Sequence, residues 1–212
     1  MERFKKIYKI YDYFNFFASF GFEKYFRFKA SRILKGFVLD AGCGKGEFTE
    51  FILRNKKVKK VVGIDITKEM VKERNKKLDS YFLLGDVHEM PFKEGKFDFV
   101  ASAFLYRNIN PERFFKECKR VLKKNGKILI LEMGLPDFFI IKFFYLIYLK
   151  FLEILTHLIF KKEISKEYKF LFESIKKFNK GEEIKKYFKN LKVLRINFGF
   201  AYIFILGYNN TL

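Results

Sequence analysis

The chain of 212 residues has no tryptophan and no glutamine, and it contains only two cysteines, two histidines and three prolines. Cys43, Cys118, His88 and His157 are too few to build a structural zinc site or a disulfide framework, so we predict no bound metal. The opening residues, MERFKKIYKIYDYF, carry charges throughout and lack the apolar run of a secretory signal. We therefore expect a cytoplasmic protein.

Long apolar runs are also scarce, with one conspicuous exception at residues 138–160. Only Lys142, Lys150, Glu153 and His157 can carry charge there, and about 20 apolar residues suffice to cross a bilayer core. At 100° per residue the four side chains fall within about 80°, which gives one polar stripe on an otherwise apolar helix. No comparable segment is present to pack beside such a stripe in a membrane. We predict a lid over an apolar substrate, with the stripe toward water or lipid headgroups, and no transmembrane span.

Acidic residues are in deficit, since 24 Asp and Glu face 44 Lys and Arg and leave a net charge of +20. The excess is densest in residues 1–35, with 9 basic against 3 acidic side chains, and in residues 161–195, with 12 against 5. Such a surplus favours an anionic partner, either the face of a membrane or nucleic acid. A lysine-rich proteome, as in adaptation to heat, is the alternative explanation.

Short apolar runs alternate with amphipathic segments through the middle of the chain. The expected strands are residues 37–40, 58–65, 81–84, 97–104 and 127–132, and the expected helices are residues 46–54, 67–77 and 111–123. Asn110 and Pro111 provide the N-cap and first turn of the last helix, and Asn125-Gly126 mark its end. This alternation predicts an α/β fold with a doubly wound, mostly parallel sheet.

A glycine-rich turn, Ala41-Gly42-Cys43-Gly44-Lys45-Gly46, joins the first strand to the first helix of this core. Glycines at alternate positions permit a sharp bend and the close approach of a ligand. The next strand ends in Asp65, about 20 residues downstream, where a carboxylate can accept from the two hydroxyls of an adenosine ribose. The third glycine is one residue early for a dinucleotide fingerprint, and Asp40 would repel a diphosphate. The pattern therefore favours S-adenosylmethionine, which carries a sulfonium and an ammonium group.

This stretch resembles the class I methyltransferase motif. The resemblance implies that Asp86, in Gly85-Asp86-Val87, accepts from the exocyclic amine of adenine and that Val87 donates its backbone N–H to the ring. The predicted cofactor-binding residues are Asp40, Gly42, Cys43, Gly44, Gly46, Asp65, Ile66, Asp86, Val87 and Ser102.

A more particular resemblance covers nearly the whole chain. The segments that carry it are Tyr11-Asp12-Tyr13-Phe14-Asn15, Ser19-Phe20-Gly21, Arg27, Gly85-Asp86-Val87-His88-Glu89-Met90-Pro91-Phe92, Arg107-Asn108, Leu131-Glu132, Tyr168, Leu171, Glu173-Ser174-Ile175 and Phe178. Together they resemble the ubiquinone/menaquinone-biosynthesis C-methyltransferase family, whose members methylate a ring carbon of a polyprenylated quinol. Phe26 replaces a usual Trp, and Tyr106 replaces a usual Leu. These two differences bear on which quinol ring the protein would accept more than on whether it transfers a methyl group.

The resemblance implies a seven-stranded Rossmann-like sheet with N-terminal helices and a helical lid inserted after the fifth strand. We expect one methyltransferase domain over residues 1–212. Residues 1–35 form a helical cap of two helices broken near residues 19–21, and residues 36–132 form the cofactor-binding core. Residues 133–180 form the lid, and residues 181–212 form a helix (181–190) and a strand hairpin (191–197 and 201–208).

The chemistry of a quinol indicates which side chains would act on it. A ring carbon becomes nucleophilic when the adjacent hydroxyl loses its proton, so the enzyme must position the ring and stabilise a phenolate. We predict that Arg107 supplies the positive charge, with Asn108 as a hydrogen-bond partner and Tyr11 closing over the pocket. The structural alternatives are a loop cap for Arg107-Asn108 and core packing for Tyr11. No general base is identified.

Several other side chains have plain structural interpretations. His88 is expected to be an exposed loop residue, and Glu153 with His157 is expected to be part of a solvated stripe. Asp98 and Glu132 receive no role.

Other functions remain compatible with these residues. They are a methyltransferase for another lipid or small aromatic molecule, and a non-catalytic binding protein of the membrane surface on the same fold. An RNA methyltransferase would suit the charge, but the Asn/Asp-Pro-Pro-aromatic signature of base-amine methylation is absent, so nucleic acid is not the expected partner. The expected partners are a prenylated quinol and the anionic inner face of the cell membrane, bound peripherally. The sequence is also compatible with a homodimer.

Overall fold

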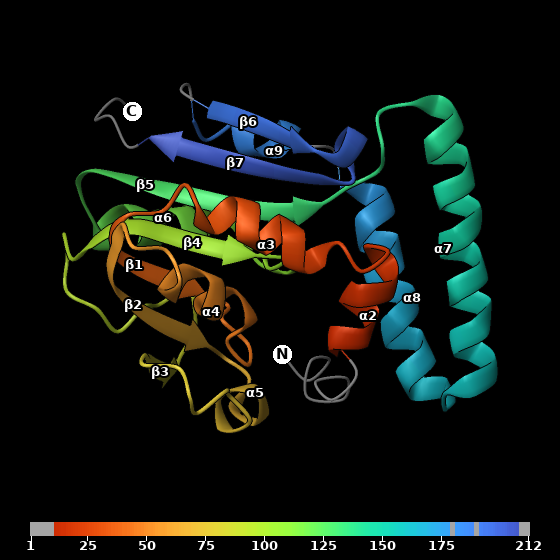
Figure 1. The fold of residues 1–212 in the computed structure, drawn as a ribbon, viewed down its shortest axis with the longest axis horizontal. Helices are drawn as coiled ribbons and strands as arrows, with labels where there is room; N and C mark the ends of the chain where they lie inside the picture. Colours follow the sequence, from red (N-terminus) through yellow and green to blue (C-terminus); the bar gives the residue numbers. More distant parts are fainter. Residues whose placement is uncertain (1–10, 179–180, 189–190, 208–212) are drawn as a thin grey trace.

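The computed structural model describes residues 11–178, 181–188 and 191–207, and these form one layered α/β unit (Figure 1). Its seven-stranded sheet has the order β3-β2-β1-β4-β5-β7-β6. The strands are β1 (Gly36–Ala41), β2 (Val58–Asp65), β3 (Tyr81–Leu84), β4 (Phe97–Ala103), β5 (Leu122–Met133), β6 (Leu191–Ile196) and β7 (Ala201–Gly207). Strands β1 to β5 pair in parallel, and β7 is antiparallel to both β5 and β6. The predicted fold class is confirmed.

Helices cover both faces of the sheet because its strands are apolar on both sides. The helices are α2 (Tyr11–Ala18), α3 (Glu23–Ser31), α4 (Glu47–Leu53), α5 (Lys68–Lys72), α6 (Pro111–Val121), α7 (Phe139–Ile159), α8 (Lys162–Lys177) and α9 (Glu182–Lys185), with 3₁₀ turns η1 (Tyr106–Asn108) and η2 (Asn197–Gly199). Val38 and Leu129 pack toward α3 and α4, whereas their neighbours Leu39 and Ile130 pack toward α6 and α9. Figure 1 shows α3 and α4 in front of the sheet and α6 and α9 behind it.

Helix α6 begins as predicted, because the Asn110 side chain accepts a hydrogen bond from the Arg113 N–H and Pro111 occupies the first turn. It ends at Val121, two residues before the predicted end. The chain enters β5 at Leu122, which pairs with Phe97. The predicted Asn125-Gly126 turn is therefore an irregularity inside the strand, where Asn125 takes a left-handed φ of 69°.

Two predicted helices are shorter than expected. The segment 67–77 is helical only over α5, because Asn75 donates its N–H to the Lys45 carbonyl and accepts from the Lys77 N–H in a local turn. The segment 181–190 is helical only over α9, and residues 189–190 lie outside the described residues, as do residues 1–10 and Tyr208 of the predicted hairpin. The predicted break between α2 and α3 is confirmed, with left-handed backbone at Phe20 and Gly21.

Helices α7 and α8 follow β5 and stand at the carboxyl end of the parallel strands (Figure 1). Tyr145 and Tyr148 attach α7 to the end of α2, since their hydroxyls donate to the Ala18 and Phe17 carbonyls at 2.6 and 3.0 Å. The predicted helical insertion after the fifth strand is confirmed. In the described parts of the chain, no helix combines the length and the hydropathy that a membrane crossing requires.

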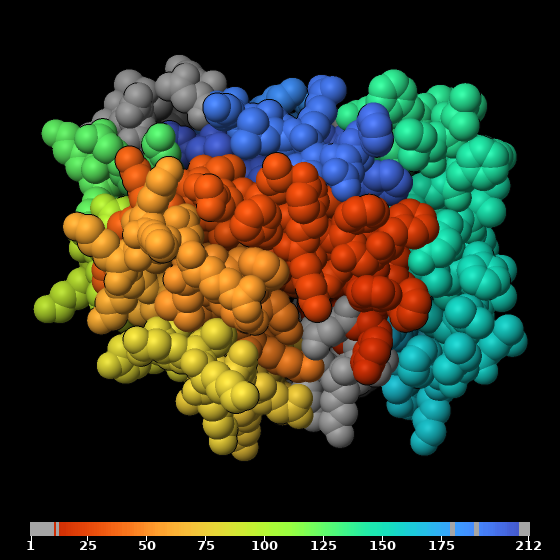
Figure 2. All heavy atoms as spheres, viewed as in Figure 1, coloured from red at the N-terminus to blue at the C-terminus, as the bar shows by residue number. Residues whose placement is uncertain are grey.

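The predicted polar stripe of α7 is exposed at Lys150 and His157 but not at Glu153. Glu153 is buried, with 4% of its surface exposed, and it accepts from Lys150 at 3.2 Å while Lys169 of α8 lies 3.9 Å away. The outward face of α7 is instead apolar, and α7 forms one edge of the molecule (Figure 2). Its exposed large side chains are Phe139, Ile140, Phe143, Phe144, Ile147, Phe151, Ile154, Leu158 and Ile159. Glu153 lies inward because α8 packs against its side of α7 and brings Lys169 near it, and helical periodicity cannot specify that neighbour.

Candidate active site

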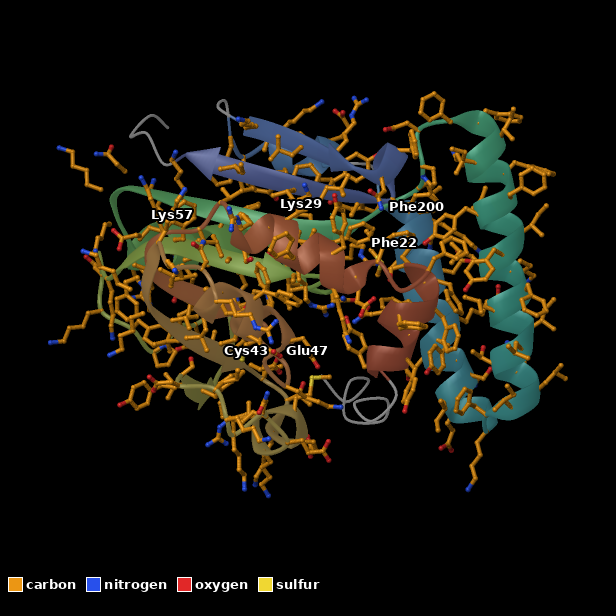
Figure 3. The ribbon with its side chains drawn as sticks, viewed as in Figure 1. Phe22, Lys29, Cys43, Glu47, Lys57 and Phe200 are labelled. Carbon is orange, nitrogen blue, oxygen red and sulfur yellow. The ribbon has the colours of Figure 1, made fainter. Side chains whose placement is uncertain are left out.

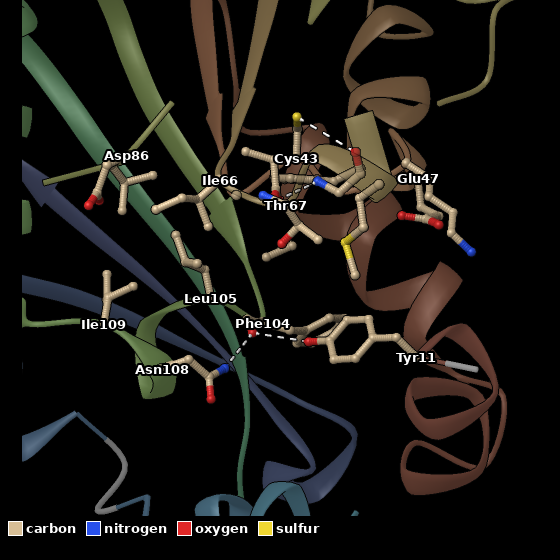
Figure 4. Close-up of a pocket in the computed structure, with 18 of the residues that line it drawn as sticks. Tyr11, Cys43, Glu47, Ile66, Thr67, Asp86, Phe104, Leu105, Asn108 and Ile109 are labelled. Atoms are coloured by element: carbon tan, nitrogen blue, oxygen red, sulfur yellow. Dashed lines mark hydrogen bonds between the residues drawn. The ribbon is translucent and has the colours of Figure 1, made fainter. Parts of the chain in front are cut away.

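A cavity of about 340 Å³ lies at the carboxyl ends of β1, β2 and β4 (Figure 4). Open α/β sheets bind ligands at this edge. Of the predicted site residues, those that line the cavity are Tyr11, Gly42, Cys43, Gly44, Asp65, Ile66, Asp86, Val87 and Asn108. Arg107, Asp40, Gly46 and Ser102 are not among the lining residues.

The glycine turn leaves β1 through left-handed backbone, with a φ of 72° at Gly42 and 56° at Gly44. A Cβ at Gly42 would come within 2.8 Å of the Leu105 side chain, whereas one at Gly44 would make ordinary contacts with the Met70 sulfur at 3.5 Å and with Glu47 Oε2 at 3.8 Å. Cys43 lines the cavity, and it lies near Glu47 at the start of α4 (Figure 3).

Gly46 serves the turn and not the cavity. It precedes α4 with a φ of 99°, and a Cβ there would approach Leu78 and Phe82 to 2.9 Å. A larger residue at this position would strain the backbone and displace two apolar side chains.

Asp65 ends β2 with a carboxylate that the backbone holds in place. Its Oδ2 accepts from the Gly44 N–H at 2.9 Å and its Oδ1 from the Thr67 N–H at 2.7 Å. Burial raises the pKa of Asp65, and these backbone donors oppose the rise. Because each carboxylate oxygen can accept a second bond, the group remains able to accept from a pair of neighbouring hydroxyls.

Asp86, Val87 and His88 form the cavity wall after β3. Asp86 Oδ1 accepts from the His88 N–H at 2.8 Å and lies 2.7 Å from His88 Nδ1. His88 Nε2 accepts from the Asn110 N–H, so the ring proton lies on Nδ1 and donates to Asp86. The predicted exposed loop role of His88 is wrong, because its ring lines the cavity and joins this wall to the start of α6.

Asp40 and Ser102 lie in the core beside the cavity and are both about 1% exposed. Asp40 Oδ2 accepts from the Thr49 hydroxyl at 2.6 Å. Asp40 Oδ1 and Ser102 Oγ have no hydrogen-bond partner within the described parts of the chain. Burial raises the pKa of Asp40 to about 7, against the bond from Thr49 and the charge of Arg27.

This carboxyl predicts a pH dependence of stability. The folded pKa of about 7 lies above the unfolded value near 3.9, so the folded state retains a proton between them. The stability from that proton is fully present below about pH 4 and is lost as the pH rises through 7. At about 1.4 kcal/mol per pKa unit, Asp40→Asn should become more stable than the wild type by up to about 4 kcal/mol at pH 8. Urea unfolding without cofactor at pH 4 and pH 8 measures this difference, and parallel profiles would contradict it.

Tyr11 and Asn108 approach one backbone carbonyl from two elements. The Tyr11 hydroxyl and Asn108 Nδ2 each lie 3.5 Å from the Phe104 carbonyl oxygen (Figure 4). Phe104 has a left-handed φ of 62°, a strained conformation for an aromatic residue that is typical of functional sites. Burial raises the pKa of Tyr11 to about 12, so its hydroxyl keeps its proton at neutral pH.

Arg107 does not reach into this cavity as the sequence suggested. Its Nε donates to Glu132 at 2.6 Å, and a terminal nitrogen donates to the Ser174 hydroxyl at 2.7 Å. The side chains of Arg107 and Glu132 are 4% and 0% exposed, so they form a buried ion pair that ties η1 to β5 and α8. Glu132, which received no role from the sequence, is thus the partner of a predicted catalytic residue.

The cavity contains a buried cation that the sequence analysis missed as a site residue. Arg27 of α3 is 6% exposed and lines the cavity, with its guanidinium 4.8 Å from the centre of the Phe104 ring. Its Nε has no hydrogen-bond partner within the described residues. Arg27 was among the residues that carried the family resemblance, and this was the available signal.

These features fit S-adenosylmethionine. The fixed Asp65 carboxylate suits the ribose hydroxyls, and Asp86 and Val87 suit adenine. The fold and the site together define a class I S-adenosylmethionine-dependent methyltransferase.

The solved structures agree on the fold. The plantazolicin methyltransferase BpumL in complex with S-adenosylhomocysteine aligns with a TM-score of 0.65 and 15% identity, covering 97% of this chain and 90% of that one. An S-adenosylmethionine-dependent methyltransferase from Aquifex aeolicus aligns with a TM-score of 0.55 and 20% identity, covering 82% and 84%.

The chain belongs to the ubiE/COQ5 methyltransferase family, whose model matches residues 1–201. It is 31% identical over 206 residues to a demethylmenaquinone methyltransferase of Bacillus licheniformis, covering 92% of this chain and 88% of that protein. It is 33% identical over 206 residues to one of Staphylococcus aureus, covering 91% and 84%. The match to a Thermotoga maritima enzyme of the same name is 32% over 143 residues, which is 65% of this chain and 62% of that protein.

Proposed function

We propose that this protein methylates a ring carbon of a polyprenylated quinol of the demethylmenaquinol type in quinone biosynthesis. The observation that carries the proposal is the composition of the cavity. One side presents the carboxylates of Asp65 and Asp86, and the other presents Phe104, Tyr11 and the buried guanidinium of Arg27. This second side suits an aromatic ring with an acidic hydroxyl, and the relatives in Bacillus and Staphylococcus named demethylmenaquinone methyltransferase support it.

The residues that line the cavity have different roles in the proposed reaction. The bound cofactor supplies a methyl group on a positively charged sulfur. Arg27 has a spare Nε donor, so it lowers the pKa of a quinol hydroxyl beside it and stabilises the phenolate once water has taken the proton. Phe104 presents an aromatic face to the ring, and Tyr11 and Asn108 close the cavity around it. Arg27 and Phe104 are 6% and 2% exposed, which keeps bulk water from competing for the phenolate.

Arg107 takes a positioning role in this scheme. Its bonds to Glu132 and Ser174 fix η1, and η1 carries Asn108 into the cavity. The predicted contribution of Arg107 to turnover then follows from placing its neighbour and not from contact with the phenolate.

Transfer of a labelled methyl group tests the function directly. The protein is incubated with methyl-labelled S-adenosylmethionine and a prenylated demethylmenaquinol kept reduced, and the product is located by mass spectrometry. Label on the ring carbon beside a quinol hydroxyl is the expected result. Label on another lipid or a small aromatic molecule, or no transfer to any lipid extract, would contradict the proposal.

We also propose that the protein binds the anionic inner face of the membrane peripherally, through the outward face of α7. That face exposes Phe143, Ile147 and Phe151, and the exposed ammonium groups of Lys150 and Lys169 lie along the seam with α8. Apolar side chains bordered by lysines suit the boundary between acyl chains and anionic headgroups.

Vesicle sedimentation should show that binding depends both on the apolar side chains of α7 and on the negative charge of the lipid. Combined Phe143→Ser, Ile147→Ser and Phe151→Ser should lower the partition into anionic vesicles about 10-fold or more, because each exposed apolar side chain contributes on insertion. Tyr81→Ser with Leu83→Ser, exposed on β3, is the matched control. Binding that ignores lipid charge and these substitutions, or self-association through the same face, would contradict the proposal.

A further inference from the structure

A second cavity, of about 360 Å³, lies between α2, α7 and α8. Ten of the described residues line it, and six of these are Phe14, Phe17, Leu152, Leu155, Phe160 and Phe172. The other four described lining residues bring no charged side chain, and Thr156 among them donates its hydroxyl to the Glu153 carbonyl at 2.8 Å. Interiors are otherwise close-packed, so an apolar space of this size is a place for a ligand.

The apolar lining of the second cavity favours an apolar ligand. Water would find too few hydrogen-bond partners here, and a charged or polar ligand would lose its hydration without compensation. Aromatic rings make up much of the wall, and the Phe14 ring centre lies 5.1 Å from that of Phe172 and 5.8 Å from that of Tyr168, both in tilted arrangements. Such walls suit a flat, methyl-branched hydrocarbon chain.

Helix α2 contributes a residue to each of the two cavities. Tyr11 lines the cofactor cavity and Phe14, one turn further along α2, lines the second cavity, with their ring centres 6.3 Å apart. The two cavities are therefore separated along α2 by about one helical turn of 5.4 Å, a span that a chain attached to a ring beside Tyr11 can cover.

The second cavity also reaches the surface next to the apolar face of α7. Phe17 and Ile159 line it and are 49% and 64% exposed, and Ile159 ends α7. A hydrocarbon chain can therefore pass from a lipid phase into the cavity without crossing a polar surface.

We propose that the cavity between α2, α7 and α8 binds the isoprenoid tail of the substrate. The identity of the ring that carries the tail rests on the proposed function. The preference of the cavity for a hydrocarbon chain rests on its apolar lining alone. The tail lies between α2 and the inner face of α7, and α7 shields it from water. The ring is thereby held at the carboxyl edge of the sheet.

The first test uses the absence of tryptophan from the chain. Ile159→Trp introduces a single indole at the mouth of the cavity, and Tyr81→Trp introduces one on the distant strand β3. Titration with geranylgeraniol, an isoprenoid without a ring, should give a saturable blue shift in the first variant and none in the second. Equal or absent shifts in the two variants would overturn the proposal whether or not the protein methylates a quinol.

The second test compares KM for substrates that differ only in the length of the isoprenoid tail. Leu155→Trp fills the cavity and should raise KM about 10-fold or more for a long-tailed demethylmenaquinol, while KM for the same ring with one isoprene unit and kcat for both stay near wild type. Unchanged S-adenosylmethionine affinity shows that the variant is folded.

The outcomes separate the two proposals. Geranylgeraniol binding without methyl transfer to any quinol would contradict the proposed function and leave the tail site standing. Methyl transfer in which Leu155→Trp affects both tail lengths equally, or neither, would overturn the tail site and leave the function standing. Loss of a dimer on Leu155→Trp, seen by light scattering, would assign the cavity to a second copy of the chain and overturn the proposal.

Discussion

Asp65→Ala should weaken S-adenosylmethionine binding by at least about 30-fold, which corresponds to about 2–4 kcal/mol for a carboxylate bonded to two hydroxyls. The structure adds a second cause. Asp65 also accepts from the Gly44 and Thr67 N–H groups, so its removal frees the glycine turn that shapes the cavity. Isothermal titration calorimetry on both proteins measures the loss.

A second carboxylate in the same sheet provides the control for this experiment. Asp98 also accepts from a backbone N–H, that of Phe37 at 2.7 Å, and it lies outside the cavity lining. Asp98→Ala should therefore lose some stability and keep its cofactor affinity. Equal affinities in wild type and Asp65→Ala would remove Asp65 from the cofactor site. Equal losses in the two variants would mean that the effect is one of folding.

Glu132→Ala should destabilise the fold by about 3–5 kcal/mol, because it leaves the guanidinium of Arg107 buried without its counterion. Exposed pairs contribute about 1 kcal/mol or less, so Lys123→Ala, which breaks the half-exposed pair with Asp98, is the matched control. Guanidinium unfolding of the three proteins gives the comparison. A loss for Glu132→Ala no larger than that for Lys123→Ala would contradict the description of Arg107–Glu132 as a buried pair.

The same pair connects stability to turnover. Arg107→Lys retains the charge but cannot bond Glu132 and Ser174 together through a planar fork. It should bind S-adenosylmethionine normally and lose kcat on a quinol, because η1 and Asn108 are no longer held in place. The joint replacement Arg107→Met with Glu132→Met should recover much of the stability lost in Glu132→Ala and remain slow. Full turnover in Arg107→Lys would show that the pair serves folding alone.

The sequence predicted the fold well because its signals are local and repeated. The alternation of strands and helices, the Asn110-Pro111 helix start and the break at residues 19–21 each depend on a few neighbouring residues, and each is confirmed. The glycine turn and Asp65 were found for the same reason. A strand, a tight turn and a carboxylate at the end of the next strand reach the same edge of any parallel sheet.

The sequence alone determined the class of fold, the family and the position of the cofactor cavity, because patterning and motif spacing fix which strand ends meet. Only the tertiary structure decided that Arg27 and not Arg107 lines that cavity and that Glu153 of α7 is buried. Arg27 reaches the cavity because α3 crosses the sheet beside it, and Arg107 is withdrawn because Glu132 and Ser174 bind it from β5 and α8. Glu153 turned inward because α8 covers its side of α7. Each outcome depends on contacts between segments far apart in the chain, and periodicity within one segment contains no information about its neighbour.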